Sequence, residues 1–332
     1  MKRLSLVCAA LGCLALILDS RCAAEGAAAG LELCLRTVLP GLFPLFVLSG
    51  ILLPQLYGLR FPSFLSRFLG IPTGAEGLFL LGLLGGFPMG AGAVAQAVKG
   101  RRLSKADGES MLGICCQCGP AFLFGMLPAV FDRPELPALC FLLQLESVLL
   151  VAHLYRGCTG AVRISAVRSP SLSEAVSGAV RAMGTVCAWI VLACVAGQYV
   201  QNYLTPLLPQ GLSFLLGAGL ELAGGCLSLR RISDPGLRLV LCAGLLSFGG
   251  VCVLLQIRAL AAEAGLSMGR CLRQKLLQSA LSMALAAGTL RFGPFFLLFP
   301  IPAACLLKKQ WKNSATCGII APIREGCDHA VS

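Results

Sequence analysis

Leu83-Leu84-Gly85-Gly86-Phe87-Pro88-Met89-Gly90-Ala91 interrupts one apolar run of the chain, and Cys116-Gln117-Cys118-Gly119-Pro120-Ala121-Phe122-Leu123-Phe124-Gly125 interrupts the next. Glycine and proline end the regular hydrogen bonding of a helix, and an unpaired backbone group in hydrocarbon is costly. Such a break is stable only where protein or a water-filled cavity receives the freed N–H and C=O groups. Because interrupted helices form the binding sites of many transporters, these stretches are the first candidates for a solute site.

Composition places the whole chain in the membrane class. Of the 332 residues, 57% are hydrophobic and 13% are charged, and the mean hydropathy is +0.84. Soluble domains carry about 25% charged residues. Apolar runs recur from end to end, so we expect an all-α integral membrane protein, a polytopic helical bundle with interrupted or re-entrant helices.

The formal net charge of +12 comes from basic residues in short clusters between the apolar runs. The clusters are Lys2/Arg3, Arg60/Arg67, Lys99/Arg101/Arg102/Lys105, Arg156/Arg163/Arg168, Arg230/Arg231/Arg238 and Lys308/Lys309/Lys312. This pattern is typical of cytoplasmic loops that follow the positive-inside rule, whereas a nucleic-acid surface would combine basic residues with spaced aromatic ones. We therefore expect the lipid bilayer as a partner and no nucleic acid.

The 18 cysteines lie mostly inside apolar runs, where a free cysteine acts as a small hydrophobic residue. Cys115-Cys116-Gln117-Cys118 contains a CxxC pattern that could bind metal or perform redox chemistry, but no second cysteine pair or histidine lies close by. Packing is the favoured interpretation, and we expect no metal site and no cofactor. No GxSxG, P-loop or nucleophile–base pair occurs, so we expect no catalytic residues and no enzyme.

The order of segments predicts four regions. Residues 1–22 form an N-terminal signal-anchor helix, with a cleaved signal peptide as the alternative. Residues 23–160 and 161–307 form two gate-like halves, and residues 308–332 a polar cytoplasmic tail. Within the halves we expect an interfacial segment at Ala23–Arg36, a span at Leu212–Leu229, and a polar interfacial stretch at Arg258–Lys275.

The glycine-rich breaks and the polar residues near them supply the candidate site. The substrate-binding candidates are Gly85, Gly86, Phe87, Pro88, Gly90, Gln117, Gly119, Pro120, Glu221, Gly224, Gly225, Ser247, Gly249, Gly250 and Gln256. Glu221 stands out because an intramembrane carboxylate is costly and points to function. The alternative is a carboxylate near the interface that pairs with a basic loop.

Four further charged or titratable residues have two interpretations each. Arg36 and Arg181 occupy equivalent positions in the two halves. We expect them to extend to the interface, with attraction of an anion as the alternative. Glu146 and His153 lie seven residues apart on one helical face. We expect an interfacial histidine, with a proton relay as the alternative.

Five ordered motifs resemble the YlbJ-type sporulation integral membrane proteins, which belong with the nucleoside-recognition, or gate-domain, membrane proteins. In the first half they are Gly30-Leu31-Glu32-Leu33 leading to Leu39-Pro40-Gly41-Leu42-Phe43-Pro44, then Gly86-Phe87-Pro88-Met89-Gly90-Ala91, then Gly119-Pro120-Ala121-Phe122-Leu123-Phe124-Gly125. In the second half they are Leu220-Glu221-Leu222-Ala223-Gly224-Gly225 and the stretch from Phe248-Gly249-Gly250 to Gln256. The resemblance covers about Gly30 to Ala280.

This resemblance implies a gate-domain fold similar to concentrative nucleoside transporters and a role in endospore formation. It implies movement of dipicolinic acid from the mother cell toward the forespore, across the outer forespore membrane of a bacterium. Gly119 stands where the family has asparagine, and Cys252 and Leu254 stand where it has serine and histidine. Gly85 and Gly92 replace positions that are often serine and lysine. These departures leave a paralogue with another solute as an alternative.

The expected function is therefore transport of a small anionic or heteroaromatic solute, with a coupling ion and a homo-oligomer left open. The alternative is a non-transporting membrane scaffold or spore-maturation assembly factor. The lost asparagine, serine and histidine favour that alternative, whereas Glu221 and Gln117 favour transport.

Overall fold

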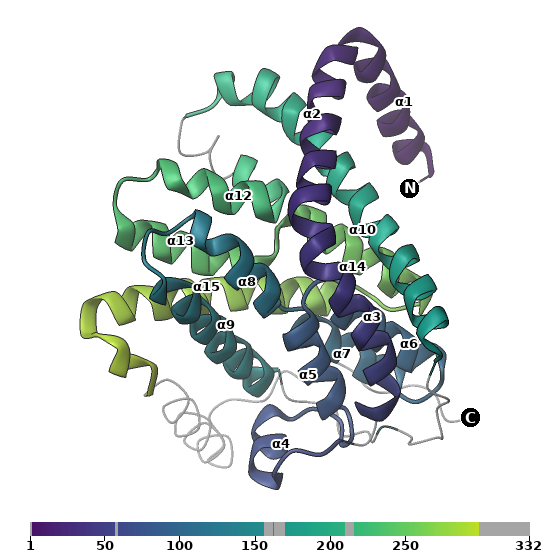
Figure 1. Cartoon of the computed structure of the whole chain (residues 1–332), viewed down its shortest axis with the longest axis vertical. Coiled ribbons are helices and arrows are strands. Elements are labelled where there is room, and N and C mark those ends of the chain that lie inside the picture. The colour runs from purple at the N-terminus through teal and green to yellow at the C-terminus, as the bar shows by residue number, and fades with distance from the viewer. Residues whose placement is uncertain (1, 57–58, 156–161, 163–169, 210–215, 299–332) are drawn as a thin grey trace, which may run out of the picture.

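The computed structural model is all-helical and describes residues 2–56, 59–155, 162, 170–209 and 216–298 (Figure 1). No strand forms in these ranges. The α-helices are α1 (Lys2–Leu18), α2 (Ser20–Leu33), α3 (Leu39–Leu56), α4 (Ser63–Leu69), α5 (Glu76–Gly85), α6 (Met89–Lys99), α7 (Lys105–Cys115), α8 (Pro120–Met126), α9 (Glu135–Leu154), α10 (Leu172–Tyr199), α12 (Leu222–Ser228), α13 (Pro235–Phe248), α14 (Gly250–Glu263) and α15 (Gly269–Phe292). Short π turns (Cys34–Val38, Val200–Leu204) and 3₁₀ turns (Leu127–Ala129, Thr205–Leu207, Leu229–Arg231, Pro294–Leu298) join or extend them.

Several of these helices are long and apolar enough to cross a membrane. Within the described residues there are 5 such stretches: Ser20–Leu52, Lys105–Ala129, Glu135–Leu154, Leu172–Leu207 and Pro235–Glu263. Each exceeds the roughly 17 residues that a hydrocarbon core requires. The all-helical, membrane-compatible architecture that composition predicted is confirmed at this level.

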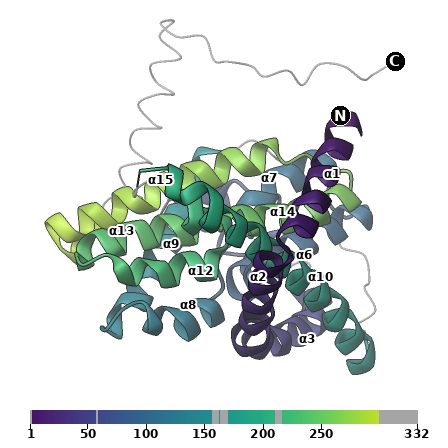
Figure 2. The same cartoon turned by 90° about the horizontal axis from the view of Figure 1, so that it is seen from above.

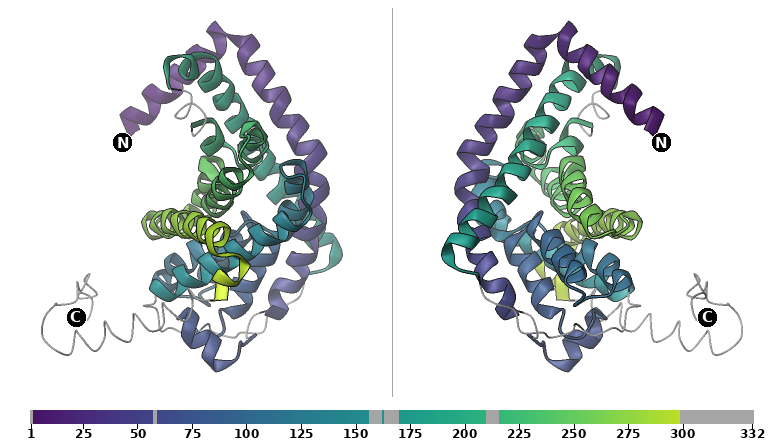
Figure 3. Two further views of the ribbon diagram at one scale, coloured as in Figure 1. Left: turned by 90° about the vertical axis from the view of Figure 1, so that its left-hand side faces the viewer. Right: turned by 90° about the vertical axis from the view of Figure 1, so that its right-hand side faces the viewer.

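A pair of long helices forms one edge of the molecule. α2 continues through the Cys34–Val38 turn into α3 and packs along α10 (Figures 1 and 3). A Cβ added to Gly26 would lie 2.7 Å from the Cα of Val195, and Gly30 is similarly close to α10. Small residues four apart let membrane helices approach closely. The interfacial segment expected at Ala23–Arg36 is therefore wrong, because its small residues pack against α10 as part of a long helix.

The remaining helices surround a shared core. Seen from above, α9, α12, α13 and α15 gather on one side, with α2, α3, α6, α10 and α14 on the other (Figure 2). α15 packs on α13, α9 and α7, and α5 packs against α6 and α7. The buried apolar residues form one large cluster across these helices and a smaller one between α3 and α10.

The basic clusters lie at both ends of this bundle. Arg270, near the start of α15, donates to the carbonyl of Tyr155, just after α9 (2.7 Å). Lys99 forms an ion pair with Glu263, the last residue of α14, which precedes α15 in the chain (2.8 Å). Arg238 instead donates to the carbonyl of Val130, before α9 begins (3.2 Å). The 20 residues of α9 are about 30 Å long. The cluster around Arg238 therefore lies at the opposite end of α9 from Arg270, and the cytoplasmic location expected for the basic clusters stays a prediction.

Candidate functional site

The two breaks of the first half lie against each other. α5 ends at Gly85, Gly86 has φ 76°, and α6 begins at Met89, so α5 and α6 fold into a hairpin. α7 ends at Cys115, and α8 begins at Pro120, after four intervening residues. A Cβ added to Gly86 would lie 2.7 Å from the backbone nitrogen of Gly119. The tip of the hairpin therefore rests on the break between α7 and α8.

The second half contains a similar pair of breaks. Residues 216–220 are helical, Glu221 is extended, and α12 follows. α13 and α14 are separated at Gly249, whose φ is 89°. A Cβ added to Gly250 would lie 3.2 Å from the carbonyl oxygen of Gly219. The continuous span expected at Leu212–Leu229 is therefore wrong, because the helix is interrupted at Glu221.

Glu221 has a local role at this interruption. Its carboxylate accepts hydrogen bonds from the backbone N–H groups of Ala223 (2.9 Å) and Gly224 (2.6 Å). These are the orphan donors at the start of α12, so Glu221 is the N-cap of that helix. Gly224 and Gly225 lie inside α12 rather than at the break.

Phe87 joins the two pairs of breaks. The Cζ atom of its ring lies 3.0 Å from where a Cβ of Gly249 would stand. On another side, the Nζ of Lys275 lies 5.1 Å from the centre of the same ring, within the range of a cation–π contact. All four interruptions of the chain therefore converge near Phe87.

Lys275 is the charged residue at this centre. Its side chain is 0% exposed, and its Nζ donates to the carbonyl of Cys116 (2.6 Å) and to Oε1 of Gln278 (2.9 Å). The Cys116 carbonyl lies at the C-terminus of α7, where a cation is favoured. No carboxylate of the described chain lies within ion-pair distance of Lys275. The interfacial location expected for the Arg258–Lys275 stretch is therefore wrong at its last residue.

A network of amides connects Lys275 to both sides of the α7–α8 break. Gln278 donates to Oε1 of Gln117 (2.6 Å). From α9, Gln144 pairs with both backbone groups of Cys118, donating to its carbonyl (2.8 Å) and accepting from its N–H (3.2 Å). Gln144 thus replaces the hydrogen bonds that the broken helix lacks, which is what an interruption in an apolar interior requires.

Some hydrogen-bonding groups at the breaks have no partner. The backbone N–H groups of Phe87, Gln117 and Gly119 make no hydrogen bond to another described residue. The buried hydroxyl of Ser247, just before the α13–α14 break, also has none within the described chain. These groups are left free to bind another molecule at the breaks.

The breaks and Gln117 were predicted from the sequence, but the other buried polar residues near them were not. Gly85, Gly86, Phe87, Pro88, Gly90, Gln117, Gly119, Pro120, Gly249 and Gly250 lie at or beside the converging breaks. The residues missed are Gln144, Ser147, Gln274, Lys275 and Gln278, all buried. A signal for them exists, because Gln274, Gln278 and Ser282 recur every four residues and so lie on one face of a helix.

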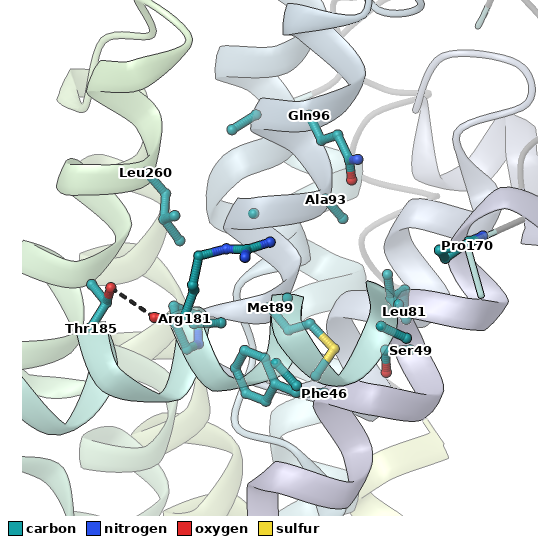
Figure 4. Close-up of a pocket in the computed structure, with 18 of the residues that line it drawn as sticks. Phe46, Ser49, Leu81, Met89, Ala93, Gln96, Pro170, Arg181, Thr185 and Leu260 are labelled. Atoms are coloured by element: carbon teal, nitrogen blue, oxygen red, sulfur yellow. Dashed lines mark hydrogen bonds between the residues drawn. The ribbon is translucent and has the colours of Figure 1, made fainter. Parts of the chain in front are cut away.

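A cavity of about 660 Å³ lies beside the first break, between α3, α5, α6, α10 and α14 (Figure 4). Pro88 and Gln256, both predicted site residues, are among its lining residues, and Lys275 is not. Gln256 contacts the sulfur of Cys252 (3.3 Å). Pro88 therefore faces the cavity, whereas the ring of the preceding residue, Phe87, contacts Lys275.

Other sequence candidates lie outside this centre. Both carboxylate oxygens of Glu146 are buried without a hydrogen-bond partner in the described chain. Nδ1 of His153 lies 3.1 Å from the carbonyl oxygen of Phe68, and its ring stacks on Phe68 at 4.5 Å. No hydrogen bond connects Glu146 with His153. The described cysteines are free, and none of them belongs to a cluster suited to a metal ion.

Comparisons with known proteins add no family to this geometry. A scan against protein-family models found no match, and searches of curated proteins and of solved structures found none either. The resemblance to YlbJ-type proteins therefore stays a prediction that depends on the five motifs.

Proposed function

We propose that the chain is a polytopic membrane transporter for a small anionic solute. The observation that carries the proposal is Lys275, a fully buried cation without an ion-pair partner in the described chain, placed where four helix interruptions meet. A buried unpaired charge is costly, so a charge of this kind points to a bound counter-ion in the working protein. An anionic solute would supply that charge.

The element order supports a construction from two diverged gate-like halves. In the first half a long helix, α2–α3, precedes a hairpin (α5, α6), a broken helix (α7, α8) and a continuous helix (α9). In the second half the long α10 precedes an interrupted segment ending in α12, a broken helix (α13, α14) and a continuous helix (α15). Repeated halves with broken helices at their interface are how many secondary transporters are built.

In the proposed mechanism, one carboxylate of the solute meets Lys275 and the free N–H groups of Phe87 and Gly119. Charge-assisted hydrogen bonds of this kind are roughly twice as strong as neutral ones. The Phe87–Pro88 peptide lies between Lys275 and the cavity, so the hairpin of α5 and α6 must move for a solute to pass. Rocking of one half against the other then switches access between the two sides.

Dipicolinate is the leading solute, and endospore formation the proposed setting, because of the resemblance to YlbJ-type proteins. Its two carboxylates and heteroaromatic ring suit an ammonium group beside the ring of Phe87. The proposed location is the outer forespore membrane.

Uptake of labelled dipicolinate into proteoliposomes tests the proposal. The purified full chain should accumulate dipicolinate above protein-free vesicles and should not accumulate its neutral diamide. Lys275→Gln keeps a donor for the Cys116 carbonyl but removes the charge, and should lower uptake about tenfold or more, equivalent to about 1.4 kcal/mol. Leu276→Ile, at an exposed neighbouring position, serves as the matched control.

The same experiment separates the transporter from a membrane scaffold. A folded wild-type protein that accumulates neither dipicolinate nor other small dicarboxylates would overturn the transport proposal and favour the scaffold. Thermal unfolding of each variant shows whether a loss of uptake reflects a loss of fold.

A further inference from the structure

Arg181 is a cation of the cavity without an acceptor. Three cationic residues line the cavity, Lys99, Arg102 and Arg181, together with the acidic Glu174 and Glu263. Lys99 is bound to Glu263 at 2.8 Å. The guanidinium group of Arg181 makes no hydrogen bond or ion pair with any described residue, and its backbone carbonyl accepts from the hydroxyl of Thr185 (3.1 Å).

The cavity extends from a charged rim to the first break. Along α6 its lining runs from Met89 to Lys99, which is about 15 Å of helix. Along α10 it runs from Glu174 to Val186, with Arg181 between them. Because Glu263 pairs with Lys99, the ends of α6 and α14 lie together at the rim, and Pro88 lies at the opposite end.

The side chain of Arg181 is exposed and lines this cavity. Figure 4 shows it crossing from α10 toward the part of α6 that carries Ala93 and Gln96, rather than pointing away from the protein. A guanidinium group is a planar fork of donors that matches the two oxygens of a carboxylate. Its position between the rim and the break suits a group that receives an anion on the way in.

We propose that this cavity is the vestibule through which the solute reaches the breaks, and that Arg181 captures a carboxylate of the solute there. The proposal rests on the transport function proposed above and adds an access side, a path and a second anion contact to it. Capture at Arg181 would raise the local concentration of the anion beside the hairpin tip, in the way that charged clefts attract counter-ions.

The path is tested by filling the vestibule at Gly178. A Cβ at Gly178 would meet no atom within 4 Å, so a side chain there starts in open space, and Gly178 lines the vestibule. Gly197 is the matched control on the same helix, equally open and similarly half-buried but outside this cavity. Gly178→Phe should lower dipicolinate uptake about tenfold, whereas Gly197→Phe should leave it near the wild-type rate.

Capture is tested by removing the charge of Arg181. Arg181→Gln should raise KM for dipicolinate about tenfold with a change in kcat below about threefold, because the contact is made before the transport step. Arg36→Gln is the matched control, since Arg36 is exposed, pairs with Glu32 at 3.2 Å and does not line the vestibule. Equal KM values for the wild type and Arg181→Gln would overturn the role of Arg181.

A labelling experiment measures the charge preference of the vestibule and does not depend on transport. In the purified full chain, a cysteine at Gly178→Cys should react about threefold faster with an anionic methanethiosulfonate than with a cationic one, measured by peptide mass spectrometry. Adding Arg181→Gln should remove this preference, and the exposed Val176→Cys should not respond to that change.

The outcomes separate the two proposals. Wild-type uptake with an unaffected Gly178→Phe variant would overturn the vestibule and leave the transport function standing. Absence of uptake by the wild type would overturn the transport function. If the labelling of Gly178→Cys shows no charge preference, the capture role of Arg181 is wrong.

Discussion

Gly86 shows how one residue determines the geometry of the site. Its φ of 76° and ψ of −169° belong to a region that only glycine occupies without strain. A side chain there would also press on the backbone nitrogen of Gly119, 2.7 Å from the added Cβ. Both constraints act at the contact between the hairpin tip and the α7–α8 break, so this contact depends on the absence of a side chain.

We predict that Gly86→Leu abolishes dipicolinate uptake while the protein still inserts in the membrane. The backbone strain alone costs about 1–3 kcal/mol, and the side chain separates the two breaks. Gly125→Leu is the control, because Gly125 lies on the adjacent α8 and a Cβ there meets nothing within 4 Å. Uptake and thermal unfolding of both variants are the measurements. Uptake at the parental rate by Gly86→Leu would place the site elsewhere.

At the scale of the element, the sequence predicts helix breaks that contain glycine or proline. It does not predict a break at which a carboxylate caps the next helix. The interruptions at Gly86, Gly119 and Gly249 were predicted in this way. Around Glu221 a continuous span was expected, but the helix is interrupted there, and α12 begins after the capping carboxylate with Gly224 and Gly225 inside it. Short helices of this kind are set by caps and packing rather than by composition.

α15 shows why the buried polar residues near the breaks were not predicted from the sequence. Its buried face carries Gln274, Lys275 and Gln278, whereas Leu276 and Leu290 are more than half exposed, at 53% and 52%. A polar helix in a membrane protein resembles a surface segment when only composition is considered. The distinction lies in which face is buried, and that depends on the breaks in α7 and α8 that α15 must satisfy.

We predict that Glu221→Gln mainly destabilises α12. Glutamine offers a single acceptor oxygen, so one of the two capped N–H groups loses its partner, at a cost of about 0.5–2 kcal/mol. The pH dependence of uptake should stay the same, because the carboxylate is used by the backbone. Thermal unfolding and uptake across a pH series measure the two effects. A shifted pH profile with unchanged stability would return Glu221 to a role in ion coupling.

At the scale of the whole molecule, the helical hairpin decides the topology. A hairpin returns the chain to the side from which it came, so Glu76 and Lys99 lie at the same end of the bundle. The C-terminus of α9 and the start of α15 lie at that end too, since Arg270 contacts Tyr155. The basic residues are more numerous there than around Arg238, which favours that end as the cytoplasmic one.

We predict that an impermeant maleimide reaches Lys105→Cys only from the cytoplasmic side and Ser233→Cys only from the opposite side. Both positions are exposed, and we expect them near opposite ends of α9, which is about 30 Å long. Labelling in intact cells, then in inverted vesicles, measures this in a background without reactive native cysteines. If α5 and α6 together formed one full span, Lys105→Cys would instead be labelled in intact cells.

The vestibule opens beside Lys99, so labelling of Lys105→Cys from inside also places its rim on the cytoplasmic side. The solute would then load from the compartment in which it is made, and the direction of transport would be outward from that compartment.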